Sequence, residues 1–170
     1  MLKKTLIASS ILLASAVCSA EGMYIGASVG QTDFGVSGID DGTTMILTGG
    51  YEFNQNYALE VSYVDLGEGE DDVAPIWTVD ASGFNIAGVG TLPINETFDV
   101  FGKIGVFVWD LSIDEDGFGE IGSDDGTDLS LGVGIAANFT EKFGGVLEYQ
   151  KFDLGGDDVN TLTIGAKLHF

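Results

Sequence analysis

The last ten residues of the chain, 161–170, alternate strictly between apolar side chains and small or polar ones. Leu162 and Ile164 fall on one face of an extended chain, whereas Thr163 and Lys167 fall on the other. Successive side chains of a β-strand point to opposite faces, so an alternation with period two indicates a strand with one apolar face. The pattern therefore predicts that the chain ends in such a strand.

Seven further segments repeat this alternation of apolar residues with small or polar ones. In chain order, the eight segments are residues 23–30, 44–53, 58–63, 84–92, 100–111, 129–139, 147–150 and 161–170. No segment shows the spacing of an amphipathic helix, in which apolar residues recur at three and four positions. The sequence therefore predicts an all-β chain with eight strands.

The fifth segment is the exception, because its alternation admits two interpretations. In a regular strand, Lys103 would lie on the same face as three aromatic residues, which are Phe101, Phe107 and Trp109. Either these aromatic side chains point to the same side as the lysine, or a β-bulge near Gly105 shifts the register of the strand. The sequence leaves both alternatives open.

The connections between the segments alternate in length. Tight turns are expected at residues 53–56, 93–97 and 139–142. Longer connections, rich in glycine and acidic residues, are expected at residues 33–43, 66–76, 112–128 and 153–160. Short turns at one end and long loops at the other are typical of outer-membrane barrels. We therefore predict an eight-stranded antiparallel up-and-down transmembrane β-barrel.

The composition of the second face decides which side of the barrel meets lipid. That face carries mainly Gly, Ser, Thr and Ala with few charges, which would make a poor solvated surface. Small and polar residues suit the narrow interior of an eight-stranded barrel. The apolar face is therefore expected to point outward to lipid. A lipocalin-like soluble carrier, with its apolar face inward, is the less favoured alternative.

The start of the chain predicts export. Lys3 and Lys4 precede an apolar run at residues 5–17, and small residues up to Ala20 follow. This arrangement is typical of a secretory signal peptide. We expect residues 1–20 to be the signal peptide and residues 21–170 to form the barrel domain. Cys18 also permits a lipoprotein interpretation, which the three residues before it fit poorly.

The charge of the chain narrows the range of partners. Acidic residues number 27 against 6 basic ones, which gives a formal net charge of −21, and arginine is absent. Such a chain would repel nucleic-acid phosphates rather than neutralise them, so nucleic acid is excluded as a partner. Hydrophobic residues make up 45% of the sequence, which argues against disorder.

The chain resembles the OmpA-type transmembrane domain and the wider family of small outer-membrane β-barrel proteins. The resemblance rests on residues 23–30, 49–53, 59–67, 102–105 and 147–149. It implies inward-facing ionic residues at Glu60 and Lys103. Leu168 and the terminal Phe170 also resemble the assembly signal that the outer-membrane barrel assembly machinery reads. The resemblance thus implies that machinery as a partner during biogenesis.

Three charged residues are expected to meet inside the barrel. Glu60, Lys103 and Glu148 all fall on the inward-facing side of their segments. An unpaired charge in a narrow interior is costly, so we interpret them mainly as a structural ion-pair cluster rather than an ion gate. Two acids around one lysine would leave a surplus negative charge, which a proton or lumenal water would have to offset.

The acidic loops suggest weak attraction of divalent ions rather than a dedicated site. Asp114, Asp116, Asp124 and Asp125 lie in one loop, but their spacing does not match a calcium-binding EF-hand loop. Facing the negative lipopolysaccharide, this rim is expected to attract Ca²⁺ or Mg²⁺ weakly. The acidity is also compatible with a saline habitat.

No catalytic constellation emerges, because His169 is the only histidine and falls at the turn end of the last strand. We therefore expect a monomeric, integral outer-membrane protein without enzymatic activity or cofactor, embedded in lipid and lipopolysaccharide. A structural or surface-presenting role is favoured. A porin-like barrel that conducts small solutes or ions is the alternative.

Overall fold

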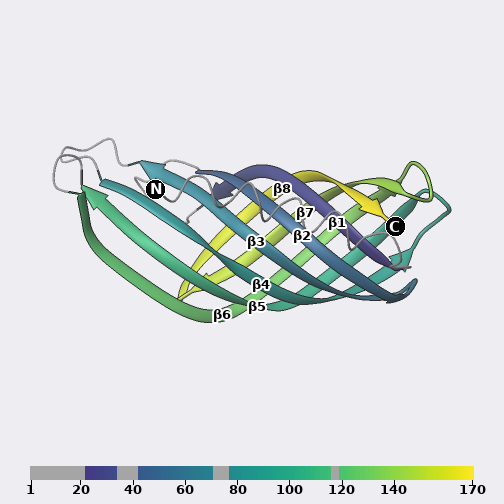
Figure 1. Cartoon of the computed structure of the whole chain (residues 1–170), viewed down its shortest axis with the longest axis horizontal. Coiled ribbons are helices and arrows are strands. Elements are labelled where there is room, and N and C mark those ends of the chain that lie inside the picture. The colour runs from purple at the N-terminus through teal and green to yellow at the C-terminus, as the bar shows by residue number, and fades with distance from the viewer. Residues whose placement is uncertain (1–21, 34–41, 71–76, 116–118) are drawn as a thin grey trace.

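The computed structural model describes residues 22–33, 42–70, 77–115 and 119–170. Within these ranges, residues 68–70, 77–80, 113–115, 119–121 and 157 are described by their backbone alone. Eight antiparallel strands follow one another in chain order, and β1 pairs with β8 to close the barrel (Figure 1). The strands are β1 (Met23–Asp33), β2 (Gly42–Asn54), β3 (Tyr57–Glu70), β4 (Trp77–Pro93), β5 (Phe98–Glu115), β6 (Gly119–Asn138), β7 (Phe143–Leu154) and β8 (Asp157–His169). The predicted fold class is confirmed. Within these ranges no helix is long and apolar enough to cross a membrane.

The apolar face of every strand points away from the barrel axis. Ile104 is 61% exposed and Val133 is 60% exposed, whereas Thr163, on the polar face of β8, is 1% exposed. Closure pairs the backbone of each strand with two neighbours, which satisfies the hydrogen-bonding groups that hydrocarbon cannot. An apolar outer surface around a closed barrel fits lipid. The lipocalin-like alternative, which needs the apolar face inside, is wrong.

Aromatic side chains gather at two levels of this outer surface. One group surrounds the end of the barrel that carries the β2–β3, β4–β5 and β6–β7 connections, which we call the turn end. It comprises Tyr51, Phe53, Tyr57, Phe98, Phe139 and Phe143. A second group lies nearer the opposite, loop end and comprises Tyr63, Phe84 and Tyr149. Two such girdles flank the apolar band of transmembrane barrels, where aromatic rings anchor at the membrane–water interfaces.

The register of β5 settles the alternatives that its sequence left open. The pairing with β4 and with β6 runs without a shift through Gly105, so there is no bulge at that residue. Phe107 is fully buried and Trp109 is 4% exposed, and both point inward with Lys103. The first alternative is therefore correct: the aromatic residues of β5 belong to the interior.

The three predicted tight turns are present, and each is closed by a polar side chain. Asn54 Oδ1 accepts hydrogen bonds from the backbone N–H groups of Asn56 and Tyr57. Asn95 Oδ1 does the same in the β4–β5 turn, and Thr140 Oγ1 does so in the β6–β7 turn. Such side-chain caps satisfy backbone donors that have no strand partner.

Two of the four predicted long loops are wrong. Most of residues 112–128 extends β5 and β6, which pair as far as Glu115 and Gly119. Residues 153–160 form a tight connection in which Leu154 pairs with Asp157 across Gly155 and Gly156, both with positive φ. These segments carry acidic residues on both faces and project beyond the apolar band, so no hydrophobic alternation marks them as strands. Of the other two predicted loops, residues 66–70 extend β3, whereas residues 34–41 and 71–76 lie outside the described residues.

Candidate functional site

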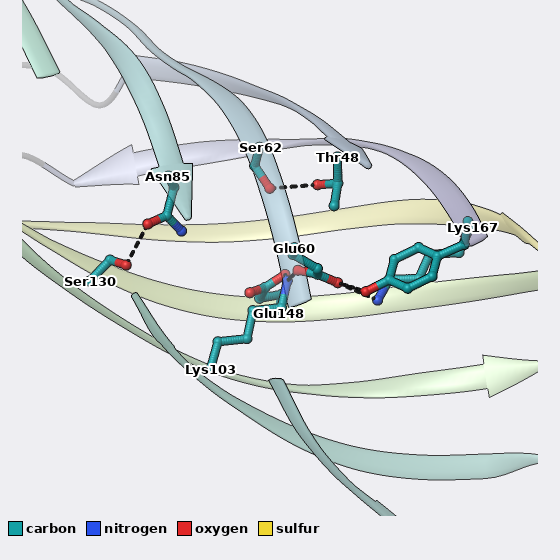
Figure 2. Close-up of polar contacts among 9 residues, drawn as sticks. Thr48, Glu60, Ser62, Asn85, Lys103, Ser130, Glu148 and Lys167 are labelled. Carbon is teal, nitrogen blue, oxygen red and sulfur yellow. Dashed lines mark hydrogen bonds and ion pairs between the residues drawn. The ribbon is translucent and has the colours of Figure 1, made fainter. Parts of the chain in front are cut away.

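Four charged side chains from four strands meet inside the barrel (Figure 2). Lys103 Nζ on β5 lies 2.5 Å from Glu60 Oε2 on β3 and 2.9 Å from Glu148 Oε2 on β7. Lys167 Nζ on β8 lies 2.9 Å from Glu60 Oε1. We call Glu60, Lys103, Glu148 and Lys167 the charged layer. The three residues expected from the sequence are therefore brought together.

Lys167 is the member that the sequence analysis missed. Alternation already placed it on the inward face of β8, but its partner depends on the closure of β8 against β1, which sequence spacing does not reveal. With two carboxylates and two ammonium groups, the charged layer has a formal net charge of zero. The expected surplus negative charge is therefore wrong, because Lys167 balances it.

Tyr24 links the charged layer to the turn end. Its hydroxyl donates a 2.5 Å hydrogen bond to Glu60 Oε1, and Lys167 Nζ lies 4.7 Å from the centre of its ring. Gly50, on the neighbouring strand β2, makes room for this ring, since a Cβ there would lie 2.1 Å from Tyr24 Cζ. Other large inward rings lie against glycines of neighbouring strands in the same way: Phe101 against Gly134, Phe107 against Gly83 and Trp109 against Gly126.

Uncharged polar pairs occupy the next level toward the loop end (Figure 2). Ser130 Oγ donates to Asn85 Oδ1 at 2.7 Å, and the hydroxyls of Thr48 and Ser62 are 2.9 Å apart. These residues point inward from β2, β3, β4 and β6. Hydrogen bonding of this kind satisfies polar groups that the lumen removes from bulk water.

An apolar cluster fills the interior on the loop side of the polar pairs. Phe107 and Phe152 are fully buried, and their ring centres are 4.6 Å apart. The cluster comprises Ile46, Val64, Leu66, Ala81, Phe107, Trp109, Phe152, Leu154 and Val159. Apart from Phe107 and Trp109, whose inward direction it left open, the sequence analysis missed this cluster because it treated the inward face as mainly small and polar. The sequence did carry a signal for it, because residues separated by an even number of positions on a strand share a face. Val64, for example, lies two and four residues beyond the inward-facing Ser62 and Glu60.

The turn end of the interior is hollow by comparison. A cavity of about 910 Å³ opens there, and its lining includes Glu52, Asp99, Asn138 and His169. His169 Nε2 lies 3.3 Å from Glu52 Oε1, and Asn138 Nδ2 donates to Asp99 Oδ2 at 2.7 Å. The only histidine thus lies at the turn end, as expected, and no serine is among the residues that line this cavity.

The remaining predicted site residues lie apart from the charged layer. Asp124 and Asp125 are exposed on β6, Asp114 is on β5 without a described side chain, and Asp116 lies outside the described residues. Across the part of the chain with described side chains, no group of three or more metal-ligating residues could hold an ion. Weak divalent attraction therefore stays a prediction.

The two residues of the predicted assembly signal lie at the end of β8. Leu168 is 40% exposed and Phe170 is 36% exposed, and both point outward at the turn end. Their placement among the turn-end aromatic residues is consistent with contact with lipid. Their role as a signal stays a prediction.

A closed barrel with an apolar outer band, two aromatic girdles and an interior filled by side chains toward its loop end defines an integral outer-membrane β-barrel protein. The chain belongs to the family of the outer membrane protein beta-barrel domain, which matches residues 5–170. The resemblance drawn from short sequence stretches is thereby confirmed. No curated protein matches the chain.

Solved structures of the same fold include small outer-membrane barrels from several bacteria. Neisserial surface protein A has a TM-score of 0.72 at 15% identity, covering 89% of this chain and 99% of that chain. Ail of Yersinia pestis, in complex with the heparin analogue sucrose octasulfate, has a TM-score of 0.61 at 20% identity, covering 87% and 96%. The N-terminal barrel of Pseudomonas aeruginosa OprF has a TM-score of 0.58 at 12% identity, covering 89% of this chain and 100% of that chain. Identities this low establish the fold alone.

Lys103→Met should destabilise the folded barrel by about 3–5 kcal/mol, because it leaves Glu60 and Glu148 buried without their shared cation. Combining it with Glu148→Gln should recover part of that loss, because Glu60 keeps its pair with Lys167 and the carboxylate left without a cation is removed. The matched control is Lys151→Met, which breaks an exposed pair with Asp158 and should cost about 0–1 kcal/mol. Urea unfolding in phospholipid bilayers measures all three. Equal effects of the two lysine substitutions would contradict the assigned role of the charged layer.

Proposed function

We propose that this protein is a structural or surface-presenting barrel of the outer membrane, with no large pore. The observation that supports this proposal best is the apolar cluster at the loop end of the lumen. An ion that crosses the barrel would have to leave water and pass fully buried Phe107 and Phe152. Transfer of a charge into such surroundings is strongly unfavourable.

The charged layer supports the same proposal. Each carboxylate is engaged by at least one ammonium group, and Lys103 is shared by Glu60 and Glu148. Ion pairs of this kind join strands across the lumen, and breaking one of them leaves a buried charge without its partner. We infer that the layer holds the barrel wall together rather than forming a ladder of sites for passing ions.

Conduction of small solutes is the second candidate function, and one observation favours it. The cavity at the turn end leads to a smaller pocket whose lining includes Tyr24 and Lys167, so the charged layer is reached from that side. A channel would need the four charged residues to exchange partners and the apolar cluster to open. We expect neither in the resting protein. An enzymatic role is the least favoured, because no serine lies among the residues that line the pockets beside His169.

We further propose that the loop end faces the cell exterior and the turn end faces the periplasm, after export and assembly as a monomer by the barrel assembly machinery. Asp124, Asp125 and Asp158 would then stand near lipopolysaccharide phosphates. Ail was solved with a heparin analogue. The acidic loop end of the present chain does not favour so negative a ligand and points instead to cationic partners or bridging divalent ions.

The purified wild-type barrel should show no steady conductance in planar bilayers, because the apolar cluster blocks the lumen, and Glu60→Gln should leave that result unchanged. The matched control is Glu141→Gln, which removes a charge at the turn-end mouth, away from the charged layer. Steady conductance that changes with Glu60→Gln but not with Glu141→Gln would favour the channel function instead.

Millimolar Ca²⁺ should raise the unfolding temperature in bilayers that contain lipopolysaccharide, because divalent ions bridge the acidic rim and the lipid phosphates. Without a preformed cage the affinity should be weak, on the order of 10⁻⁴–10⁻³ M. Monovalent salt should give part of the effect, since like charges repel within a Debye length of about 8 Å. Calorimetry measures the unfolding temperature of three proteins, which are the wild type, the double variant Asp124→Asn with Asp125→Asn, and the turn-end control Glu96→Gln. An unfolding temperature indifferent to chelator and salt would contradict it.

A further inference from the structure

One edge of β6 is left without a partner near the loop end. β6 pairs with β5 from Gly119 to Ala137, but it pairs with β7 only between Ser130 and Asn138. Figure 1 shows β5 and β6 running past the connection between β7 and β8. Within the described ranges, no strand pairs with the β7-side edge of β6 before Ser130. We call residues 122–127 on this side the free edge of β6.

The direction of the backbone groups along this edge follows from the turn at the other end of β6. Asn138 N donates to Thr97 O, on the β5 side, whereas Phe139 N donates to Phe143 O, on the β7 side. These directions alternate along a strand, and the register with β5 is unbroken from Gly122 to Ala137. Odd-numbered residues of β6 therefore direct their N–H and C=O groups toward β7.

At the free edge these odd-numbered residues are Ser123, Asp125 and Thr127, and all three side chains are exposed. One local contact agrees with this assignment: Asp125 N donates to Asp124 Oδ1 at 3.0 Å and so is not engaged by β5. A row of backbone N–H and C=O groups directed away from β5, in the plane of the sheet, is a template for an added strand.

The loop end has a second strand edge, on β3, but a bulge distorts it. The β3–β4 register shifts between Asp65 and Glu68, and Gly67 has a φ of +77°. Asp65 Oδ1 also accepts a hydrogen bond from Gly67 N. Bulges of this kind bend an edge away from added partners. The free edge of β6 keeps an unbroken register with β5 from Gly122 onward, and its own register shift lies at its far end, between Gly122 and Glu120.

Contacts from β5 and from the β7–β8 connection hold the free edge in place. Trp109 Nε1 donates to Asp128 Oδ2 at 2.8 Å, and Gly155 N donates to the same oxygen at 3.1 Å. The Trp109 ring lies over Gly126, where a Cβ would come within 2.6 Å of it. The edge is therefore preorganised, which lowers the entropic cost of binding.

We propose that the free edge of β6 binds an extended, cationic peptide segment of a partner protein by strand addition. Five or six residues of such a segment would span it, at about 3.3 Å per residue. Asp124 and Asp125 favour lysine or arginine side chains beside the backbone pairing and disfavour a second copy of this acidic chain. The proposal deepens the surface-presenting function and rests on the loop end facing the exterior.

The test uses a fluorescently labelled hexapeptide of alternating threonine and lysine, titrated against the full barrel in detergent micelles. The matched control is the same peptide with every backbone amide N-methylated, which keeps the charge but leaves no N–H on either edge to complete the ladder. The unmodified peptide should bind at least about fivefold more tightly, the equivalent of one or more hydrogen bonds. Equal binding of both peptides would overturn the proposal, because charge alone would then explain the contact.

Two pairs of variants locate the site on the protein. Thr127→Pro removes one N–H of the free edge without touching the β5 ladder and should weaken binding about fivefold, whereas Thr127→Val should not. Asp125→Asn should weaken binding more than Glu96→Gln, which removes the same charge at the turn end. If Thr127→Pro does not fold, the peptide pair and Asp125→Asn still decide. Unchanged affinity in Asp125→Asn and in a folded Thr127→Pro would overturn the assignment to this edge.

Self-association of the barrel through this edge would give a different result from peptide binding. Concentration-dependent dimers of the barrel alone that Asp125→Asn strengthens would overturn the proposal in favour of a second copy. The micelle assay does not depend on orientation in the membrane. Labelling of a Ser123→Cys variant on intact cells with an impermeant reagent tests orientation separately, so failure of the surface-presenting function is distinguishable from failure of the edge to bind.

Discussion

The satisfaction of backbone hydrogen bonds in a hydrocarbon solvent is the constraint on which the rest of this structure depends. Each unpaired N–H or C=O group in lipid costs several kcal/mol, so a sheet in the membrane has to close. Here β1 pairs with β8 along ten residue pairs from Tyr24 to Asp33. Closure fixes the alternation of the strands, because one face then meets lipid and the other meets a narrow lumen. Near the loop end, outside the apolar band, the constraint relaxes, and there β6 can carry an unpaired edge.

The lumen of an eight-stranded barrel is so narrow that its side chains have to fill it and satisfy one another. In this chain the filling is layered: an open hollow at the turn end, then a charge-balanced layer, then hydrogen-bonded polar pairs, then an apolar cluster. Glycines on adjacent strands admit the large inward rings, as Gly50 does for Tyr24. Charge balance and glycine placement therefore act together, since the ring of Tyr24 brings its hydroxyl to Glu60.

The sequence predicted what the lipid constraint imposes and little of what depends on contacts across the barrel. Alternation was sufficient for the strands, their faces and the inward position of Glu60, because these follow from local periodicity, whereas the inward position of Lys103 was implied by the family resemblance. It could not pair Lys167 with Glu60, which are 107 residues apart and meet only after closure. It also could not find the ends of β5 and β6, since acidic residues at both odd and even positions leave no apolar pattern in the sequence. The interior aromatic residues were ambiguous because parity alone does not distinguish a bulge from a filled lumen.

The central claim is that the lumen is sealed at its loop end and open at its turn end. Reaction of single-cysteine variants with a water-soluble thiol reagent tests it most directly, since the only native cysteine, Cys18, lies in the predicted signal peptide. Thr91→Cys, in the lining of the turn-end cavity, should react readily, and Ser123→Cys should react at the loop end. Val64→Cys, within the apolar cluster, should react orders of magnitude more slowly while the barrel stays folded. Comparable rates at Val64→Cys and Thr91→Cys would contradict a sealed lumen and indicate a water-filled path through the protein.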